Sequence, residues 1–349
     1  MKDIKPVRLV VIGLGMATKP HLEALTDPAC LIEVSGIYNR THAKAEAVAE
    51  RYGYRIFNSL EEIAADPEVE GVIITTPPDQ RREIVEVMAK AGKHILMEKP
   101  VERSVAGARH LVEICEKHGV QFGIVLQHRF RAGAKRLNSL VASGALGKIA
   151  LVRVEVPWWR DQSYYDTPGR GTLARDGGGV LISQAIHVLD LMLSVVGPAK
   201  TVQAFCTTTS LHKMETEDFA TTGIQFVSGA VGSVVATTAT FPGSQESIII
   251  DGTKGTAELR SGRLQVNWRD GRKEETGELS GTGGGADPMA FPCDWHKELM
   301  ADFAMAIRNN RAPRINGREA LKVHALIDAI TRSSTEGKMA EVTSVAATK

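Results

Sequence analysis

The chain has 349 residues, which exceeds the usual size of one hydrophobic core, so two domains are expected. Its 42 Lys and Arg against 41 Asp and Glu leave a formal charge of +1, which gives no electrostatic basis for binding nucleic acid or an anionic membrane. The four cysteines are widely spaced, so disulfide bonds are not expected, and a reducing compartment is favoured. No stretch is long enough to span a bilayer and no signal peptide is expected, so a cytoplasmic location is predicted.

The first third of the chain alternates strand-like and helix-like segments. Residues 7–13 (VRLVVIG) form a continuous, branched apolar run, which is typical of a strand buried on both faces. Helical periodicity follows, and the alternation repeats as far as VQFGIVL at residues 120–126. Strands that alternate with helices of ten to fifteen residues predict a parallel sheet built from right-handed crossovers.

A glycine-rich turn sits between the first strand and the first helix. In Gly13-Leu14-Gly15-Met16 the first glycine permits a tight turn, and the second lets a pyrophosphate approach the backbone and the helix N-terminus. Thr18 stands where a third Gly or Ala is usual, so the fingerprint is imperfect, and a glycine turn without a ligand stays open. We assign residues 1–126 to a Rossmann NAD(P)-binding domain, with Gly13, Gly15 and Met16 at the cofactor.

The end of the second strand is expected to select the cofactor. An acid there would bind the ribose hydroxyls of NAD, but Asn39 replaces it and Arg40 follows. The planar guanidinium of Arg40 can face a 2′-phosphate, so NADP is favoured over NAD. An alternative also fits, in which Asn39 and Thr41 cap the helix expected from Ala43 and Arg40 is solvated.

Two further strand ends fall on the cofactor side of the predicted sheet. The segment TTPPD ends one strand, and its Thr75, Thr76 and Pro77 are assigned to the cofactor site. The segment MEKP ends the next strand, and Glu98 and Lys99 are assigned there too. Ligands of doubly wound sheets bind at the carboxyl ends of the strands, where both segments are expected.

These pieces resemble the Gfo/Idh/MocA family of oxidoreductases, which includes glucose-fructose oxidoreductase and inositol dehydrogenase. The motifs that carry the resemblance occur in the family's order and span nearly the whole chain. They are G-x-G with His21 eight residues after Gly13, TTPPDQ, AGKHILMEKP, SGALGKI, GGGVLISQAIHVLD and HKELMADFAMAI.

The resemblance implies a nucleotide-binding domain followed by an α/β domain with a large, mostly antiparallel sheet that is open on one face. Residues 127–349 are assigned to that second domain, for substrate binding and oligomerisation. Their strand-like segments are rich in Val, Thr and Ile and are separated by glycine turns, which agrees. A broad open face needs a partner, so a homodimer or homotetramer through this sheet is expected.

Lys99 is the first candidate for catalysis. Oxidation of a secondary alcohol needs a base for the hydroxyl proton, and reduction needs an acid at the carbonyl oxygen. The resemblance implies that the lysine of the E-K-P motif is the catalytic or substrate-polarising group. Glu98 could orient the lysine or the cofactor amide.

His187 is the second candidate, and it lies on an apolar helix whose other ionisable residue is Asp190. In many family members the position of Ser183 is Asp, so this departure leaves the proton route open. Ser183 and Gln184 can still hydrogen-bond substrate hydroxyls. A buried, non-catalytic pair of His187 with Asp190 is the alternative.

An aromatic stretch, VPWWRDQSYYDTPGRGTLARD, precedes the three glycines of this helix. Trp159 and Tyr165 could stack on a sugar ring, and Arg160 could grip a phosphate or carboxylate, as in a sugar nucleotide or a sugar acid. Packing as loop core or at a subunit contact is the alternative. Arg129, in LQHRF, is a further substrate candidate.

Taken together, the sequence predicts an NAD(P)-dependent dehydrogenase or reductase acting on a sugar, a sugar derivative or a cyclitol. Two other interpretations stay open: a non-catalytic NAD(P) sensor, and a reductase of a non-sugar carbonyl or imine. No metal is expected, because Cys293 and His296 of CDWH lack the further ligands of a zinc site.

Overall fold

The computed structural model describes residues 4–279 and 292–344, which divide into two compact units. The first unit contains the described residues up to Leu126 together with Cys293–Leu321. The second contains the described residues from Gln127 to Pro292 and from Lys322 onward. The segment 293–321 therefore belongs to the first unit, whereas the sequence analysis placed it in the second domain.

The first unit is built on a five-stranded parallel sheet with the order β2-β1-β3-β4-β5. Nearly every residue of β1, β3, β4 and β5 is buried, as expected for strands covered on both faces. The strands are β1 (Val7–Ile12), β2 (Ile32–Tyr38), β3 (Gly71–Ile74), β4 (His94–Glu98) and β5 (Phe122–Val125).

Helices cover both faces of this sheet. The chain leaves β1 toward β2 and leaves β3 in the opposite direction toward β4 and β5, so right-handed crossovers place α1 on one face and α4 and α5 on the other. The late helix α9 packs with α1 and against β1, β2 and β5. The helices are α1 (Thr18–Leu25), α2 (His42–Tyr52), α3 (Leu60–Ala65), α4 (Arg81–Lys90), α5 (Val105–Lys117) and α9 (Asp294–Arg308), with short 3-10 turns at Pro28–Cys30 and Pro78–Gln80.

Helix α9 belongs to the first unit because its apolar face packs against the five-stranded parallel sheet. Its Leu299, Met300 and Phe303 are buried, and Phe303 packs so closely on Gly123 of β5 that a Cβ there would lie 2.8 Å from the ring. The amphipathic period of this helix was visible in the sequence, but the sheet that it covers was not, because periodicity does not identify a partner.

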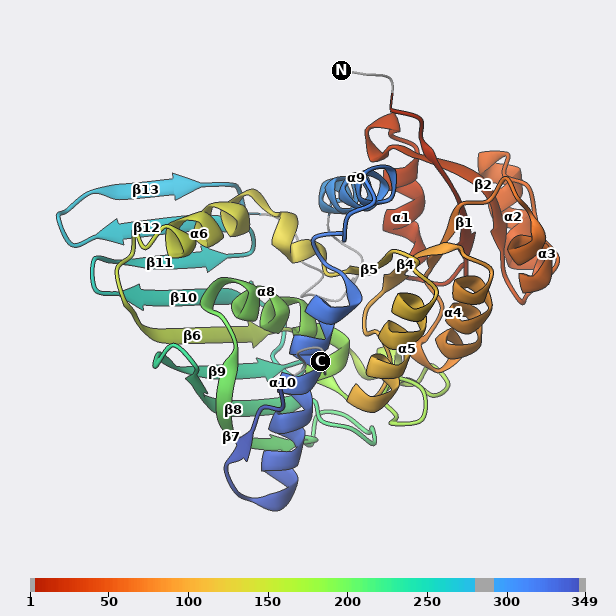
Figure 1. The fold of residues 1–349 in the computed structure, drawn as a ribbon. Coiled ribbons are helices and arrows are strands. Elements are labelled where there is room, and N and C mark those ends of the chain that lie inside the picture. The colour runs from red at the N-terminus through yellow and green to blue at the C-terminus, as the bar shows by residue number, and fades with distance from the viewer. Residues whose placement is uncertain (1–3, 280–291, 345–349) are drawn as a thin grey trace. The chain divides into compact units, whose positions relative to one another are not determined.

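The second unit is built on a nine-stranded sheet with the order β13-β12-β11-β10-β6-β9-β8-β7-β14, and Figure 1 labels its strands from β13 to β7. The pair β6–β9 is parallel and the other pairs are antiparallel, which confirms the predicted fold class. The strands are β6 (Ile149–Pro157), β7 (Ala199–Thr207), β8 (Phe219–Phe226), β9 (Val231–Thr237), β10 (Ser247–Gly252), β11 (Gly255–Arg260), β12 (Arg263–Trp268), β13 (Lys273–Thr276) and β14 (Ala340–Glu341).

Helices α6 and α8 pack against one face of this sheet. Along β6, Val152, Val154 and Val156 point to that face and are buried, whereas Leu151 and Glu155 alternate with them on the other face. The helices of this unit are α6 (Ala132–Ala142), α7 (Gln162–Tyr165), a π-helical turn (Leu181–Ala185) continuous with α8 (Ile186–Val196), and most of α10 (Gly317–Glu336), which begins in the first unit; a 3-10 turn spans Gln127–Phe130.

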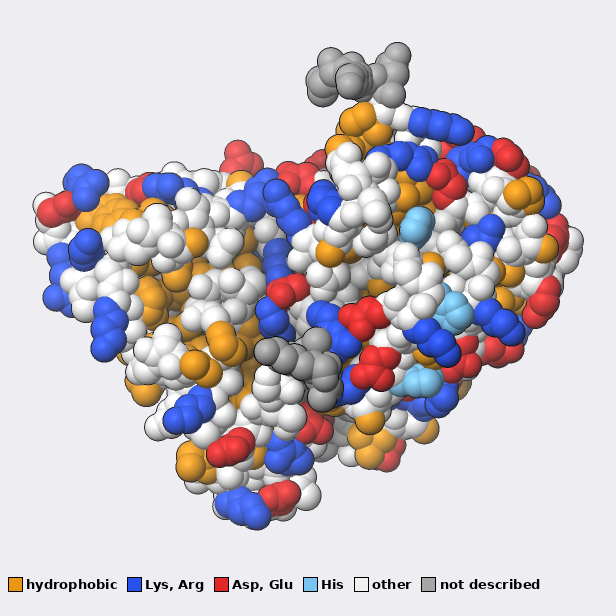
Figure 2. Space-filling view, in the orientation of Figure 1, with side chains coloured by type: hydrophobic (Ala, Val, Ile, Leu, Met, Phe, Trp, Pro, Cys, Tyr) orange, Lys and Arg blue, Asp and Glu red, His pale blue; other side chains and the backbone are white. Residues whose placement is uncertain are grey.

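Charged side chains of both signs are interspersed over the face shown in Figure 2, in keeping with the formal charge of +1. Among the described residues, no helix combines the length and the apolar character needed to cross a membrane.

Candidate active site

The glycine-rich turn after β1 has the geometry of a phosphate cradle. Gly13 has φ +90°, and a Cβ on it would lie 2.6 Å from the Thr76 side chain, so only glycine fits. Around Gly15 the situation is the reverse, because no atom of the described chain lies within 4 Å of an added Cβ. The first glycine therefore closes the turn on β3, and the second leaves open space beside the backbone.

Hydroxyl groups hold this turn against the strand ends. The carbonyl oxygen of Gly13 accepts from Thr75 Oγ1 at 2.6 Å and from Thr18 Oγ1 at 3.0 Å. Thr18 is buried where a small third residue was expected, so its hydroxyl serves the turn instead of clashing with it. Met16, at the tip, is half exposed.

Asn39 braces the same turn from the end of β2. Its Oδ1 accepts from the Leu14 amide at 3.0 Å, and its amide group donates to the Thr41 carbonyl oxygen. Helix α2 begins at His42, and its N-cap residue Thr41 makes no side-chain cap hydrogen bond. The alternative in which Asn39 and Thr41 cap this helix through their side chains is therefore wrong.

Arg40 lies beyond Asn39 on the surface. Its Nη1 donates to Gln80 Oε1 at 3.0 Å, which joins the end of β2 to the 3-10 turn after β3. Arg40 is exposed and Gln80 is half-buried, so the guanidinium is accessible to solvent next to Asn39, which braces the glycine-rich turn.

One buried polar atom at the turn lacks an internal partner. Thr76 Oγ1 is inaccessible and has no hydrogen-bond partner within the described part of the chain. Pro77 follows at the start of the 3-10 turn. With open space at Gly15 and an unsatisfied hydroxyl at Thr76, the turn fits a dinucleotide that supplies hydrogen-bonding oxygens.

Arg81 fixes the segment that carries Lys99. Its buried guanidinium donates to the carbonyl oxygens of Glu98 (2.5 Å), Lys99 (3.4 Å) and Pro100, and its Nε donates to Thr76 O at 2.9 Å. Burial lowers the pKa of Arg81 to about 10, which still leaves it positive at neutral pH. One charged side chain thus ties the ends of β3 and β4 together and sets the path of the backbone at Lys99.

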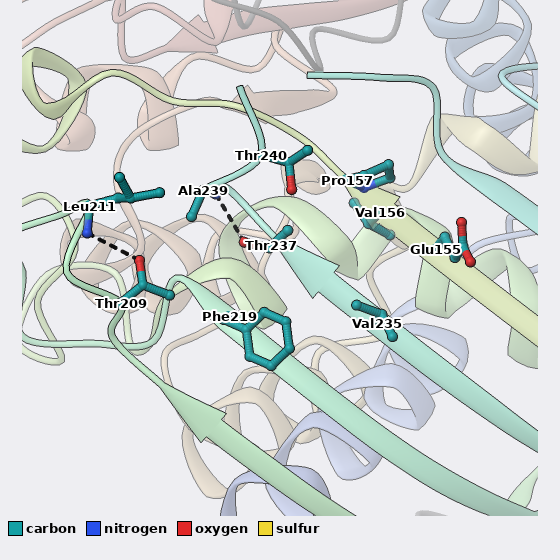
Figure 3. A pocket seen from close by; sticks show the side chains of 10 residues that line it. All are labelled: Glu155, Val156, Pro157, Thr209, Leu211, Phe219, Val235, Thr237, Ala239 and Thr240. Atoms are coloured by element: carbon teal, nitrogen blue, oxygen red, sulfur yellow. Dashed lines mark hydrogen bonds between the residues drawn. The ribbon is translucent and has the colours of Figure 1, made fainter. Parts of the chain in front are cut away.

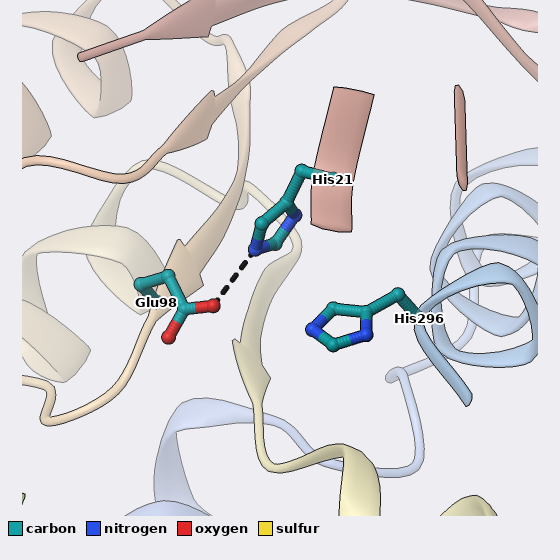
Figure 4. Close-up of side chains that lie close together, drawn as sticks. All are labelled: His21, Glu98 and His296. Carbon is teal, nitrogen blue, oxygen red and sulfur yellow. Dashed lines mark hydrogen bonds and ion pairs between the residues drawn. The ribbon is translucent and has the colours of Figure 1, made fainter. Parts of the chain in front are cut away.

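Glu98 lies beside two histidines, His21 and His296, and hydrogen-bonds His21, as Figure 4 shows. Its Oε1 lies 2.7 Å from His21 Nε2, and its Oε2 accepts from the Lys99 amide at 3.1 Å. Burial acts to raise the pKa of Glu98, but the His21 hydrogen bond and nearby positive charge lower it to about 2. His296 meets the His21 ring edge-to-face at 5.1 Å, and burial lowers the pKa of His296 to about 3.

His21, Glu98 and His296 are also side chains of the kinds that bind metal ions. Their nearest ligand atoms lie within 4.8 Å of one another, and two histidines with a glutamate can bind zinc. Ligands on tetrahedral zinc are separated by about 3.3 Å, given bonds of about 2.0 Å. The 2.7 Å between His21 and Glu98 is instead a hydrogen-bond distance, so the trio as it stands supports the E-K-P segment.

In the second unit, the three-glycine segment packs against Glu217. A Cβ on Gly179 would lie 1.8 Å from the Glu217 carbonyl oxygen, which requires glycine there. The Glu217 carboxylate accepts from the amides of Gly179 and Leu181 at 3.0 and 3.1 Å, and burial raises its pKa. Ser183 and Gln184 follow within the π-helical turn, a deviation that is frequent at functional sites.

His187 stacks on a second histidine. Its ring centroid lies 4.8 Å from that of His128, with 24° between the planes. His128 Nε2 lies 2.6 Å from Arg131 Nη2, and the buried Arg131 forms an ion pair with Glu246. Because a guanidinium only donates, His128 Nε2 must accept, which places its proton on Nδ1 and keeps that ring neutral. His187 therefore faces a neutral neighbour.

The carboxylate of the apolar helix is paired with an arginine. Asp190, 1% exposed, accepts from Arg129 Nε at 2.7 Å and Nη2 at 2.5 Å in a bidentate ion pair. From the sequence, Asp190 is a candidate partner of His187, and Arg129 is a candidate substrate ligand. The structure pairs the two with each other, and contact of Arg129 with substrate stays a prediction.

The aromatic stretch is anchored to the sheet. Tyr165 is buried, and its hydroxyl lies 2.7 Å from Thr238 Oγ1, so it belongs to the core of the loop. Trp159 bridges to Ala239 and meets the ring of Phe241 edge-to-face. Arg160 is also buried, and its Nη1 donates to the Trp159 carbonyl oxygen.

Several residues of the site were not found from the sequence. Arg81 is buried and is followed by another arginine, Arg82, so the sequence alone does not indicate which of the two is buried. Glu217 lies far along the chain from the glycines that it caps, and the pairing of Arg131 with Glu246 spans 115 positions. Such long-range partners are set by tertiary packing, which a single sequence does not display. Lys99 lies in the first unit and His187 in the second.

Comparisons with known proteins agree with these features. A family model described as "Oxidoreductase family, NAD-binding Rossmann fold" matches residues 7–125, and the "GFO/IDH/MocA C-terminal domain" matches residues 134–258. A D-apiose dehydrogenase from Paraburkholderia graminis is 25% identical, over 99% of this chain and 92% of its own. A myo-inositol 2-dehydrogenase from Thermotoga maritima is 24% identical, over 95% of this chain and 97% of its own.

A solved structure of similar fold is the WlbA dehydrogenase from Bordetella pertussis in complex with NADH and UDP-GlcNAcA. It is 28% identical, with a TM-score of 0.83 over 97% of this chain and 99% of that one. The two family models together match most of the chain, in both of its units. The protein therefore belongs to the Gfo/Idh/MocA family of oxidoreductases.

Proposed function

We propose that the protein is an NAD(P)-dependent dehydrogenase or reductase that transfers a hydride between nicotinamide and a secondary alcohol or ketone of a sugar, a sugar derivative or a cyclitol. The observation that carries this proposal is the glycine turn together with the braced E-K-P segment. Both lie at the carboxyl ends of parallel strands, where such sheets bind dinucleotides. The sugar and cyclitol dehydrogenases among its relatives support the substrate class.

The cofactor-binding residues divide into two groups. Gly13, Gly15 and Thr76 would hold the pyrophosphate, with Met16, Thr75 and Pro77 around it. Asn39 and Arg40 would lie at the adenosine ribose, and Glu98 and Lys99 near the nicotinamide end. The nicotinamide, when bound, accepts or donates the hydride.

Lys99 and His187 are the proposed proton-transfer groups. Arg81 and Glu98 fix the backbone of Lys99 and thereby limit the positions of its ammonium group. His187 stacks on the ring of His128, whose Nε2 accepts a hydrogen bond from Arg131. Ser183 and Gln184, one turn before His187, would orient the substrate hydroxyls.

We propose that NADP is preferred over NAD. This rests on Arg40, whose accessible guanidinium lies beyond the end of β2, with no carboxylate at position 39 to repel a 2′-phosphate.

We also propose that the protein is a homodimer or homotetramer through the open face of the nine-stranded sheet. Leu151, Phe205, Val231 and Val235 share this face by strand register, and each is more than a third exposed. A cavity of about 340 Å³ lies beside them at the ends of β6, β8 and β9 (Figure 3). Its lining residues are Glu155, Val156, Pro157, Thr209, Leu211, Phe219, Val235, Thr237, Ala239 and Thr240.

A reducing, cytoplasmic location is part of the proposal. Cys30, Cys115, Cys206 and Cys293 are all free thiols. Burial raises the pKa of Cys30 and Cys115 to about 12, so these thiols are protonated and unreactive at neutral pH.

The replacement Lys99→Ala tests the catalytic assignment. It should lower kcat by at least about a thousandfold, the scale of a lost general acid or base, while nucleotide affinity measured by fluorescence titration stays within about threefold of the parent. Lys90→Ala, on the exposed end of α4, is the matched control and should keep parental turnover. Parental turnover in Lys99→Ala would remove this residue from the mechanism.

A further inference from the structure

The aromatic stretch ahead of the catalytic helix brings two arginines to one tyrosine. The Cζ atom of Arg170 lies 4.1 Å from the centroid of the Tyr164 ring, and that of Arg160 lies 5.6 Å from it. A tyrosine face attracts one guanidinium. Two guanidiniums around one ring also repel each other, so the arrangement carries an electrostatic cost.

The backbone holds both arginines in place. The Arg160 amide donates to Thr238 O at 2.9 Å, and its carbonyl oxygen lies 2.8 Å from Nε2 of the buried His212. Arg170 closes a turn by donating its amide to Thr167 O. The next residue, Gly171, has φ +70° and a carbonyl oxygen that accepts from Thr216. These contacts fix the main chain from which both arginine side chains extend.

The carboxylates of the same loop are committed elsewhere. Asp161 accepts from the Ser163 amide, Asp166 from the Gln162 side chain, and Asp176 from the Gly171 amide. No carboxylate of the described chain lies within 4 Å of the Arg170 guanidinium, whose Nε is buried without a hydrogen-bond partner. Burial lowers the pKa of Arg160; Tyr164 and Tyr165 oppose this effect, and the charge of Arg170 adds to it.

Gln184 connects the cluster of Tyr164, Arg160 and Arg170 to the helix that carries His187. Its Nε2 donates to the Tyr164 hydroxyl at 3.4 Å, three residues before His187. Only 5% of the residue is exposed, and its Oε1 is buried with no hydrogen-bond partner in the described chain. Through Tyr164, this unsatisfied acceptor belongs to the same cluster as the two cations, and the combination is suited to a ligand that carries both a hydroxyl group and a negative charge.

We infer that Arg160, Arg170 and Tyr164 form an anion subsite of the substrate site, so that the substrate is an acidic carbohydrate with a carboxylate or phosphate group. Arg170 binds the anion with its planar fork, and Gln184 Oε1 accepts from a neighbouring hydroxyl. This inference rests on the proposed function, because it names the substrate class of the same site.

The test compares matched ligands that differ in charge. An uncharged hexose, the matching hexuronate, the matching sugar phosphate and a nucleotide-linked hexuronate are assayed for kcat/KM. Binding of each is also measured by calorimetry with NADP present. The parent protein should favour at least one acidic ligand over the uncharged hexose by about tenfold or more, the scale of one charge-assisted hydrogen bond. Which acidic ligand is favoured distinguishes the carboxylate from the phosphate.

Arg170→Gln should reduce that preference for the acidic ligand about tenfold, and Arg170→Lys should restore part of it. Lys213→Gln removes an exposed charge near the same loop and is the matched control, which should keep the parental preference. Equal affinity for charged and uncharged ligands, or an unchanged preference in Arg170→Gln, would overturn the inference. Acidic ligands that bind through Arg170 without turnover would support the subsite and contradict the proposed function instead.

Discussion

At the residue scale, the site depends on a few buried polar side chains that hold main-chain groups in place. Arg81 satisfies four carbonyl oxygens, and Glu98 satisfies an amide and a histidine. Buried carbonyl groups that lose their partners cost about 1–3 kcal/mol each. The position of Lys99 is therefore set by its neighbours, and their replacement should act on it indirectly.

Arg81→Met is expected to destabilise the first unit by about 3 kcal/mol and to lower kcat more than it changes KM, because the E-K-P backbone loses its donors. Urea unfolding and steady-state kinetics measure the two effects. Arg82→Met, at the adjacent exposed position on α4, is the matched control. A stable Arg81→Met protein with parental kcat would show that the guanidinium does not position Lys99.

Arg40→Ala is expected to weaken NADP binding by at least about tenfold and NAD binding by less than about twofold, because only NADP has a phosphate for this guanidinium. Equilibrium titration of both nucleotides measures the difference. Arg51→Ala, at the far end of α2, should leave both affinities unchanged. Equal losses for the two nucleotides would contradict the phosphate role.

Many of the candidate site residues could be predicted from the sequence, whereas some of their contacts could not. Gly13, Lys99 and His187 stand in motifs whose spacing follows strand and helix ends, so they could be assigned before the fold was known. The pairing of Asp190 with Arg129 was missed because the sequence showed His187 as the nearer neighbour on the helix. Spacing along one helix identifies local contacts, whereas a partner from another segment depends on packing.

At the element scale, α9 shows how a helix from the end of the chain completes the first unit. Arg308, in its last turn, donates to the carbonyl oxygens of Lys5 and Pro6 and forms a bidentate ion pair with Glu70. The Arg308 hydrogen bond and that of the Arg8 amide, against the opposing effect of burial, lower the pKa of Glu70 to about 2. A carboxylate with a lowered folded-state pKa stabilises the fold above its unfolded pKa and loses that effect as pH falls.

The contribution of Glu70 is expected to be complete above about pH 4.5 and to be lost progressively toward about pH 2. Between about pH 6 and pH 3, the parent should therefore lose on the order of 2 kcal/mol more unfolding free energy than Glu70→Gln. Urea unfolding at both pH values measures this difference. Glu50→Gln, at an exposed carboxylate of α2, is the control and should follow the parent; a Glu70→Gln protein with the parental pH dependence would contradict the account.

At the scale of the whole molecule, the fold class followed from the alternation of strands and helices and from the resemblance of its motifs. The assignment of 293–321 did not follow, because the chain returns to the first unit after the second sheet. Linear order suggested a single boundary between the domains. Only the packing of α9 on β1, β2 and β5 shows the return.

The open sheet face gives a prediction about assembly. We expect a dimer or tetramer by size exclusion with light scattering, and we expect the double replacement Leu151→Asp with Val235→Asp to shift it toward monomer, because charges would be buried unpaired at the contact. Val227→Asp, at an exposed apolar position outside the sheet strands, is the matched control. A monomeric parent, or an unchanged assembly in the double variant, would contradict the proposed interface.

The most direct test of hydride transfer follows the hydrogen itself. Sugars, inositols, sugar acids and sugar nucleotides, each deuterated at the carbinol carbons, are incubated with the protein and with NAD or NADP, and the re-isolated nicotinamide is analysed by mass spectrometry. The account predicts that at least one acidic carbohydrate delivers a single deuterium to the cofactor, and that Lys99→Ala does so at least about a thousandfold more slowly. Bound nucleotide that stays unlabelled across every class of carbohydrate would contradict it.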